Sequence, residues 1–249
     1  MRSATATPET SRPSVFWPLA AIIVPAVGLF ARIEIRGAEH LPRDGAYVLA
    51  PNHNSEFDPL VVAVAVWRLG RAPRFMAKES LFRVPVLGAA LKATGMVPVP
   101  RASSGANQSM KAAEQIARDG RGVIVYAEGT LTRDPDLWPM RGKTGAVRLA
   151  LAGGLPLIPM AQWGVQQILP RYGKLRFPRR SHVIVEFGPA MDLSAYAATP
   201  TQPSTLIAAT DTMMNRVAGM LSGIRGLPAP TVRWDPTKHG QNETGRLEP

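Results

Sequence analysis

A histidine and an aspartate five residues apart are the side chains best suited to chemistry in this sequence. His53 and Asp58 lie in the run PNHNSEFDP, residues 51–59. A carboxylate that binds one imidazole nitrogen fixes the tautomer and makes the other nitrogen a better base. The pair could therefore remove a proton from a hydroxyl. Aspartate before proline is also a common helix start, so Asp58 could instead be the N-cap residue of a helix.

Two later segments end in residues that suit an anionic ligand. Residues 95–101 (GMVPVPR) end in Arg101, whose guanidinium could hold a phosphate through two parallel hydrogen bonds. The apolar run VIVYA leads into Glu128, Gly129 and Thr130. A glycine lets the backbone come close to a ligand, and its amide can face an oxyanion. Taken alone, each segment is also typical of an ordinary turn or strand end.

From residue 33 onward, apolar runs alternate with helical patterns. The strand-like runs cover residues 33–35, 46–50, 75–77, 96–99, 123–126, 156–161 and 183–187. Helical patterns cover residues 59–68, 85–94, 107–119, 143–152 and 204–223. The alternation predicts an α/β fold with a mostly parallel mixed sheet flanked by helices. His53 then follows the C-terminal end of a buried strand, where open α/β sheets bind ligands. Two prolines in the run 156–161 predict a place near a sheet edge or against an acyl chain.

The chain divides into four segments. Residues 1–13 are polar and expected to be loose, residues 33–223 form the folded domain, and residues 224–249 form an irregular tail. Residues 14–32 contain an uncharged run of 17 residues with two prolines. At about 1.5 Å per residue it reaches about 25 Å, less than a hydrocarbon core of about 30 Å. We expect this apolar helical segment to lie in a membrane interface without spanning it. A buried helical hairpin is the alternative.

The charge balance favours a polyanionic partner. There are 29 basic and 18 acidic residues, which gives a net charge of +11. Nucleic acid, an anionic membrane or a phosphorylated substrate would all fit. The arginines are scattered, which argues against nucleic acid. The chain has no cysteine, which excludes disulfides, thiolate zinc sites and a cysteine nucleophile. No HExxH or HxxxH spacing occurs, so no metal site is expected.

The order and content of these segments resemble the signature blocks of the 1-acylglycerol-3-phosphate acyltransferase family. NHNSEFD at 52–58 is similar to the NHxSxxD motif, GMVPVPR at 95–101 to the second block, EGT at 128–130 to the third, and PLIP at 156–159 to the fourth. The resemblance covers about residues 33 to 190. Four blocks in one order are far more specific than an HxxxxD pair. It implies a glycerolipid acyltransferase-like fold, with His53 and Asp58 catalytic.

The resemblance also implies a set of substrate-binding residues. They are Arg101, Glu128, Gly129, Thr130, Arg133 and Lys143. Glu128 would hold an acceptor hydroxyl, and the basic residues would hold a phosphate. The third family block usually reads EGTRS, but Leu131 stands at the arginine position, and Arg133 could replace it from a shifted place. This departure bears on the acceptor more than on the reaction.

The implied reaction transfers a fatty acyl group from acyl-CoA or acyl-ACP to a hydroxyl of a lysophospholipid. The simplest acceptor is 1-acylglycerol-3-phosphate, which would give phosphatidic acid in phospholipid biosynthesis. His53 would be the base and Asp58 its orienting partner. Backbone amides at 54–55 or 129–130 are candidate donors to the oxyanion. Without a cysteine or a Gly-x-Ser-x-Gly elbow, direct transfer is expected, with no cofactor beyond the thioester co-substrate.

The expected partners are membrane lipid, the acyl carrier and a phosphorylated lysolipid, with no nucleic acid. We expect a peripheral or monotopic place on the cytoplasmic face of the membrane. A basic stretch could meet anionic headgroups or carrier phosphates, or be a solvated loop: Arg171, Lys174, Arg176, Arg179 and Arg180. Glycerol-3-phosphate or another (glyco)lysolipid is the alternative acceptor. A hydrolase that uses water and a non-catalytic lipid-binding module are the rival functions.

Overall fold

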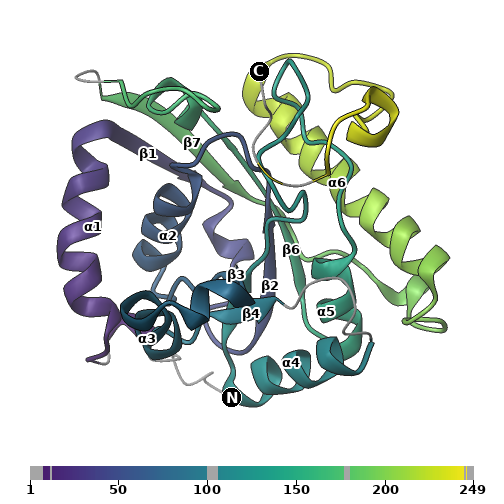
Figure 1. Ribbon diagram of the computed structural model, residues 1–249, viewed down its shortest axis with the longest axis horizontal. Helices are drawn as coiled ribbons and strands as arrows, with labels where there is room; N and C mark the ends of the chain where they lie inside the picture. The colour runs from purple at the N-terminus through teal and green to yellow at the C-terminus, as the bar shows by residue number, and fades with distance from the viewer. Residues whose placement is uncertain (1–7, 12, 100–105, 177–179, 244, 246–249) are drawn as a thin grey trace.

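Seven strands and six α-helices alternate along the chain in this computed structural model, which describes residues 8–11, 13–99, 106–176, 180–243 and 245. The strands are β1 (Ala31–Arg36), β2 (Tyr47–Pro51), β3 (Met76–Lys78), β4 (Val97–Val99), β5 (Gly122–Ile124), β6 (Leu157–Trp163) and β7 (Ser181–Phe187). The helices are α1 (Phe16–Phe30), α2 (Asp58–Arg68), α3 (Pro85–Ala93), α4 (Ala106–Asp119), α5 (Gly145–Gly153) and α6 (Pro203–Arg225) (Figure 1). Short 3-10 helices cover Glu9–Ser11, Ala38–His40, Glu79–Arg83, Val165–Gln167, Ser194–Tyr196 and Pro236–His239.

Five strands form one mixed sheet in the order β1-β7-β6-β2-β5. The neighbours run parallel except β6 and β7, which are antiparallel. Strands β3 and β4 form a separate parallel pair, which joins β5 through a bridge between Phe75 and Ile124. The prediction of a mostly parallel mixed α/β sheet is therefore confirmed.

Helices cover both faces of the sheet because successive strand residues point to opposite sides. On β2, Leu49 packs in a core with α1 and α2. Val48 and Ala50 pack in a second core with α4, α5 and α6. Figure 1 shows α1 and α2 on one side of the strands and α5 and α6 on the other. Burial on both faces accounts for the continuous apolar runs in the sequence.

Strand β6 lies in the middle of the sheet, between β7 and β2, so the predicted edge position of this proline-containing run is wrong. The carbonyl of Pro159 accepts a hydrogen bond from the amide of Gly188 at 2.8 Å, just past the end of β7. The N–H and C=O of one residue in a hydrogen-bonded antiparallel pair face the same neighbour. The nitrogen of Pro159 therefore faces β7. The β6–β7 ladder ends at the pair Met160 and Phe187, so no ladder hydrogen bond requires an N–H at residue 159.

Helix α1 continues without a break from Phe16 to Phe30 and contains Pro25. The alternative of a helical hairpin is therefore wrong. Its inner face packs on α2, where the rings of Phe16 and Trp17 lie 6.5 and 6.3 Å from Trp67. Within the described part of the chain, no helix combines the length and the apolar character that crossing a membrane requires.

The segments before α1 and after α6 are both tied to the domain, the first by a charged side chain and the second by a backbone hydrogen bond. Near the start, Glu9 bonds Nε of Arg71 at 3.1 Å and Nη1 of Arg74 at 3.0 Å. This anchor was not expected from the polar composition of residues 1–13. Beyond α6, the C-terminal segment (residues 226–243 and 245) returns to the domain. There the amide of Arg141 donates to the carbonyl of Trp234 at 2.8 Å.

Candidate active site

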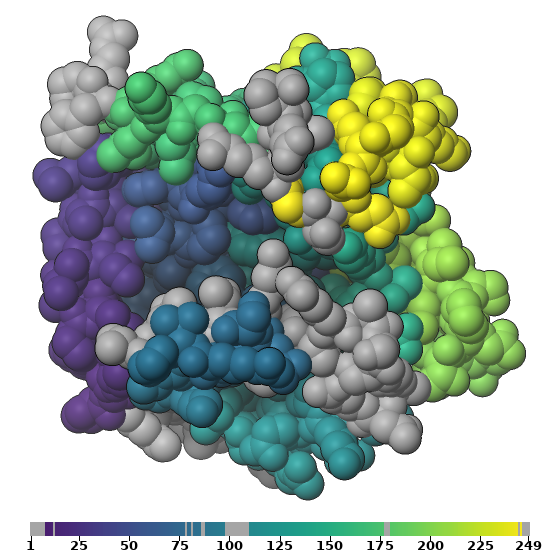
Figure 2. Space-filling model, viewed as in Figure 1, coloured from purple at the N-terminus to yellow at the C-terminus, as the bar shows by residue number. Residues whose placement is uncertain are grey.

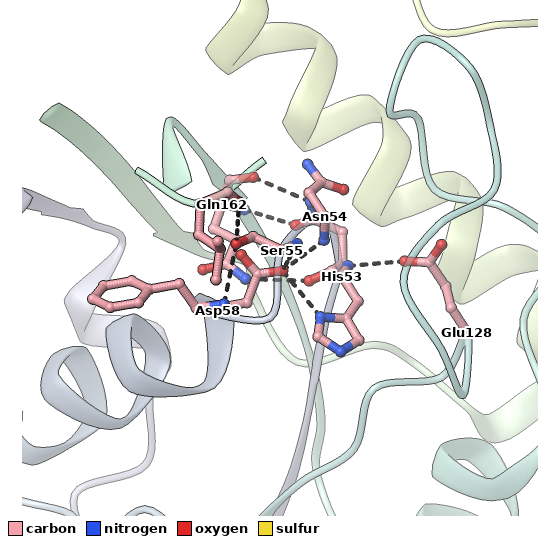
Figure 3. A network of polar contacts seen from close by, with 9 residues as sticks. His53, Asn54, Ser55, Asp58, Glu128 and Gln162 are labelled. Atoms are coloured by element: carbon pink, nitrogen blue, oxygen red, sulfur yellow. Dashed lines mark hydrogen bonds and ion pairs between the residues drawn. The ribbon is translucent and has the colours of Figure 1, made fainter. Parts of the chain in front are cut away.

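The turn at residues 52–58 joins the C-terminal end of β2 to α2 and brings the predicted pair together. Nδ1 of His53 lies 3.0 Å from Oδ2 of Asp58 (Figure 3). The same oxygen accepts the backbone amides of Asn54 at 2.6 Å and Ser55 at 2.9 Å. Three donors on one oxygen fix the carboxylate, which is 0% exposed. The pairing predicted from the spacing is therefore present.

The carboxylate of Asp58 does not cap α2, and the N-cap interpretation is wrong. Asp58 is the first residue of the helix, Phe57 precedes it, and no side chain caps the first turn. The carboxylate instead turns back to the 52–58 turn. Burial raises the pKa of Asp58, while the bonds from His53, Ser55 and Asn54 act in the opposite direction. These bonds suit a carboxylate that stabilises an imidazolium.

The second ring nitrogen of His53, Nε2, has no partner among the described residues, and the side chain is 15% exposed. With Nδ1 turned to Asp58, Nε2 is the atom that could accept a proton. A buried carboxylate, an oriented imidazole and a free nitrogen form the arrangement that general base catalysis requires.

Residues 126–132, which follow β5, surround His53 from the other side. The Tyr126 ring stacks on the imidazole at 4.0 Å between centroids. Oε1 of Glu128 accepts the amide of His53 at 2.9 Å, and the amide of Thr132 donates to the carbonyl of His53 at 2.7 Å. One segment thus contacts the ring, the N–H and the C=O of the candidate base.

Glu128 is 1% exposed, and both of its oxygens face backbone amides. Oε2 accepts the amide of Met140 at 3.0 Å. Burial raises the pKa of Glu128 to about 8, against the opposing effect of the Met140 and His53 amides and the Thr132 hydroxyl. The predicted contact of Glu128 with an acceptor hydroxyl stays a prediction.

The structure brings Gly129 and Lys143 together. Gly129 has a φ of +72°, and a Cβ placed on it would lie 3.1 Å from Cδ of Lys143. A side chain at residue 129 would therefore push the lysine away from the turn. Lys143 is exposed, and its amide donates to the carbonyl of Ala127 at 2.6 Å. Its ammonium can therefore reach a ligand at this turn.

Thr130 and Arg133 converge on one oxygen of the C-terminal segment. Oγ1 of Thr130 and Nη2 of Arg133 each lie 3.2 Å from the carbonyl oxygen of Gly245. Arg133 is buried, and its Nε has no partner in the described part of the chain. The predicted phosphate contacts of both residues stay predictions. Arg101 lies outside the described residues.

The amides first expected to form an oxyanion hole already have acceptors. Those of Asn54 and Ser55 donate to Asp58, so that choice is wrong. The amide of Gly129 donates to the carbonyl of Tyr126 at 3.0 Å. Of the four expected amides, that of Thr130 is the one with no acceptor among the described residues. It is the remaining candidate.

Residues that the sequence reasoning missed tie the 52–58 turn to β6. Asn52 and Gln162 exchange hydrogen bonds: Nδ2 of Asn52 donates to the Gln162 carbonyl at 3.1 Å, and the Gln162 amide donates to Oδ1 of Asn52 at 2.8 Å. Ser55 Oγ donates to the carbonyl of Leu169 at 2.6 Å. A glutamine within the apolar run of β6 was the available signal for this network.

Arg171 also has a structural role within the domain, which the basic stretch around it in the sequence did not indicate. Its Nη1 donates to the carbonyls of Thr132 at 2.5 Å and Asp134 at 2.8 Å. Nη1 of this guanidinium therefore holds the loop at residues 132–134, and the contact of Arg171 with a headgroup or a carrier phosphate stays a prediction.

An apolar groove of about 190 Å³ lies between α1 and α2. Its lining includes Phe16, Ile23, Leu60, Trp67, Phe75 and Met96. The Phe75 ring lies 6.2 Å from Tyr126, which in turn stacks on His53. Two rings therefore separate the groove from the candidate base. Figure 2 shows this face of the molecule, hollowed between α1 at the left and the C-terminal segment at the upper right.

Comparison with known proteins gives consistent matches. The sequence pattern of the Acyltransferase family matches residues 32–163. A chloroplastic 1-acyl-sn-glycerol-3-phosphate acyltransferase of Brassica napus is 31% identical over 143 residues, which cover 57% of this chain and 40% of that protein. A 1-acyl-sn-glycerol-3-phosphate acyltransferase of Bacillus subtilis is 29% identical over 74% of this chain and 86% of its own length.

A solved structure shares the fold. The crystal structure of the 1-acyl-sn-glycerophosphate acyltransferase PlsC from Thermotoga maritima superimposes with a TM-score of 0.62 at 20% identity. The match covers 89% of this chain and 81% of that one. The chain spans only about two fifths of the length of the plant relatives, 40% and 38% for the chloroplastic proteins of B. napus and Arabidopsis thaliana.

Proposed function

This chain belongs to the acyltransferase family, and we propose that it moves a fatty acyl group from a thioester to the free hydroxyl of 1-acylglycerol-3-phosphate. The observation that carries the proposal is the 3.0 Å contact between His53 and Asp58 at the end of β2. The names of the B. napus and B. subtilis relatives support this acceptor. The product would be phosphatidic acid, and the reaction would be a step of phospholipid synthesis.

In the proposed mechanism, Nε2 of His53 takes the proton of the acceptor hydroxyl as its oxygen attacks the thioester carbonyl. The new ester C–O bond forms, the C–S bond breaks, and the imidazolium returns its proton to the departing thiolate. Asp58 holds Nδ1 and stabilises the imidazolium while the proton is on the ring. General base catalysis of this kind contributes about 10²–10⁴-fold to the rate.

The apolar groove between α1 and α2 is the proposed site for an acyl chain. Its described lining is apolar, and its Phe75 end lies next to the aromatic pair that leads to His53. A chain in this groove would bury methylene groups at about 0.8 kcal/mol each. Arg133 and Lys143, which lie near the 128–130 turn, are proposed contacts for the acceptor phosphate. Arg101 is a third proposed contact, on the ground of the family resemblance alone.

We propose that α1 attaches the protein to one membrane leaflet on the cytoplasmic side. Its outer face is a stripe of exposed apolar residues at helical spacing: Pro18, Ala21, Ile22, Pro25, Ala26 and Leu29. Ile22 is 70% exposed and Leu29 is 71% exposed. Exposed apolar stripes without charge favour a lipid interface. The net charge of +11 adds attraction to anionic lipids.

The test is an acyl-transfer assay on the purified chain with acyl-CoA and acyl-ACP in parallel. The acceptors are 1-acylglycerol-3-phosphate, glycerol-3-phosphate, a lysophospholipid with a headgroup on its phosphate, and none. We expect thiol release only with an acceptor, and phosphatidic acid by mass with the first. Thiol release without an acceptor would establish a hydrolase, and lysolipid binding without thiol release a binding module. A product from another acceptor would replace the proposed substrate.

A further inference from the structure

We infer that Glu128 is a positioning residue that holds the backbone of His53, so that the 126–132 segment acts as a cradle for the base. The inference rests on the proposed function only in taking His53 as the base. It differs from the part that the family resemblance implies for Glu128, which is contact with the acceptor.

The sheet register explains why a side chain is required at this point. Strands β2 and β5 pair in parallel with a constant offset, since Tyr47 faces Gly122, 75 residues later. His53 and Glu128 are also 75 residues apart. The ladder stops before it reaches them, because β2 ends at Pro51 and β5 ends at Ile124. The Glu128 carboxylate accepts the His53 amide at the place where a continued strand would have supplied a carbonyl.

The other end of the carboxylate is fixed as well. Oε2 accepts the amide of Met140 at 3.0 Å, so Glu128 joins the turn that carries His53 to the loop that precedes α5. At 1% exposed, the carboxyl group has little contact with solvent. Each oxygen could accept a second hydrogen bond, but the burial of the carboxyl group leaves little access for an acceptor hydroxyl.

Four contacts together fix His53. Glu128 holds the N–H, Thr132 holds the C=O, Asp58 holds Nδ1, and Tyr126 covers one face of the ring. Backbone bonds on both sides of a residue fix the position of its Cα. The bond to Nδ1 and the stacked ring then fix the direction of Nε2. Reacting atoms must be placed within a fraction of an ångström for full catalysis.

The substitutions Glu128→Gln, Glu128→Asp and Glu128→Ala separate positioning from acceptor binding. Burial raises the pKa of Glu128 to about 8, so glutamine matches the neutral charge of the native side chain at pH 7. Its carbonyl oxygen keeps the bond from the His53 amide, and the bond from the Met140 amide is lost. Aspartate is one methylene shorter and cannot reach both amides. Alanine removes both bonds. Lys143→Ala is the matched control for a lost phosphate contact, with a raised KM for the acceptor.

Kinetics and an NMR signal of His53 are the two measurements. We expect Glu128→Ala and Glu128→Asp to lower kcat by about 100-fold, the cost of a misplacement of about 1 Å, with little change in acceptor KM. Glu128→Gln should restore most of that loss. The imidazole Hε1 signal should move or broaden in the first two variants and stay near its native position in the glutamine variant. Circular dichroism and melting confirm that each variant is folded.

Opposite results would overturn the inference. A raised acceptor KM with unchanged kcat in all three variants would assign Glu128 to acceptor binding. A native kcat and a native His53 signal in folded Glu128→Asp would show that the amide bonds do not position the base. If Glu128→Ala does not fold, the aspartate and glutamine pair still decides. The NMR signal can be read without turnover, so failure of the proposed function and failure of this inference are distinguishable.

Discussion

The 52–58 turn and helix α1 are held in place by opposite kinds of contact. In the turn, polar groups are buried and bonded to several other elements: Asn52 to β6, His53 to the 126–132 segment, and Ser55 to the loop after β6. Helix α1 has no charged or hydrogen-bonding side chain from Phe16 to Phe30 apart from the indole of Trp17. Its inner face packs on α2 through aromatic and aliphatic contacts.

The difference teaches which property each region has to supply. Hydrogen bonds are directional, so a network of them selects one geometry, which is what proton transfer requires. Apolar burial is roughly proportional to area and has no preferred direction, which suits a helix that meets fluid lipid. Substitutions in the turn should therefore change activity per folded molecule, whereas substitutions on the outer face of α1 should change where the protein is found.

The largest effect is expected from His53→Ala. The base is lost, so kcat should fall by about 10²–10⁴-fold, while the fold is kept because the amide and carbonyl of residue 53 stay bonded to Glu128 and Thr132. Steady-state kinetics with acyl-CoA, next to a melting curve, checks this. A kcat within a few-fold of the native value would show that His53 is not the base and that the 52–58 turn has no part in catalysis.

A smaller loss is expected from Asp58→Asn. The asparagine oxygen can take the place of Oδ2 and accept the same three donors, and its amide can occupy the place of Oδ1, which has no partner among the described residues. The tautomer of His53 is kept, but the negative charge beside the imidazolium is lost. We expect kcat to fall by about 10- to 100-fold, as for one charged hydrogen bond. Loss equal to that of His53→Ala would mean that the turn itself has rearranged.

For α1, the outer and inner faces provide a matched pair. The double substitution Ile22→Ser/Leu29→Ser removes exposed apolar area, so binding to anionic vesicles should weaken at least tenfold, about 1.4 kcal/mol, with the melting temperature unchanged. Val27→Ala, at a position 1% exposed, should lower stability by about 1–2 kcal/mol and leave vesicle binding intact. Vesicle flotation and thermal melting measure the two quantities. If the Ile22→Ser/Leu29→Ser variant floats with vesicles as well as the native protein does, α1 is not the membrane anchor.

Salt tests the charged part of the same attachment. Exposed charges are screened as the Debye length falls from about 10 Å at 0.1 M salt to about 3 Å at 1 M, whereas apolar burial is not. We expect 1 M salt to release the native protein from anionic vesicles only in part, and the Ile22→Ser/Leu29→Ser protein almost fully. Complete release of the native protein by salt alone would contradict the apolar anchor.

A pH dependence of stability is expected from Glu128, beside the turn, and has no counterpart in α1, which contains no titratable side chain. The folded pKa of Glu128, about 8, is above its unfolded value of 4.5. Its contribution is therefore fully present below pH 4.5 and is lost as the pH rises through about 8. The melting temperature of the native protein, relative to Glu128→Gln, should therefore fall as the pH rises over this range. Val27→Ala changes no titratable group, so its difference from the native protein should be the same at every pH.

The sequence predicts best what is local. The strands and helices lie close to the expected ranges because hydrophobic period and turn residues are short-range signals. The pairing of His53 with Asp58 was predictable because five residues in one turn determine it. The bond from Glu128 to His53 was not, because it depends on the offset of 75 residues between β2 and β5. No local pattern contains that number.

The wrong interpretations have a related cause. A proline within a strand costs stability only if the neighbouring strand needs its N–H. For Pro159 that neighbour is β7, whose ladder with β6 ends one residue short of it, at Met160. Aspartate before proline is typical of a cap, yet the Asp58 carboxylate has stronger donors behind it in the His53, Asn54 and Ser55 groups. In both cases a residue with a common local meaning takes its part from a partner that the local sequence does not specify.

The pairing of β1 with β7 has a consequence for the order in which the chain can fold. Ala31 lies beside Ser181, 150 residues later. At about 5–20 residues per second, synthesis of that stretch takes about 8 to 30 s. During this time the first strand has no neighbour, although α2 can already cover the inner face of α1. The first strand to leave the ribosome is therefore among the last to be paired, and completion of the sheet waits for the chain beyond residue 181.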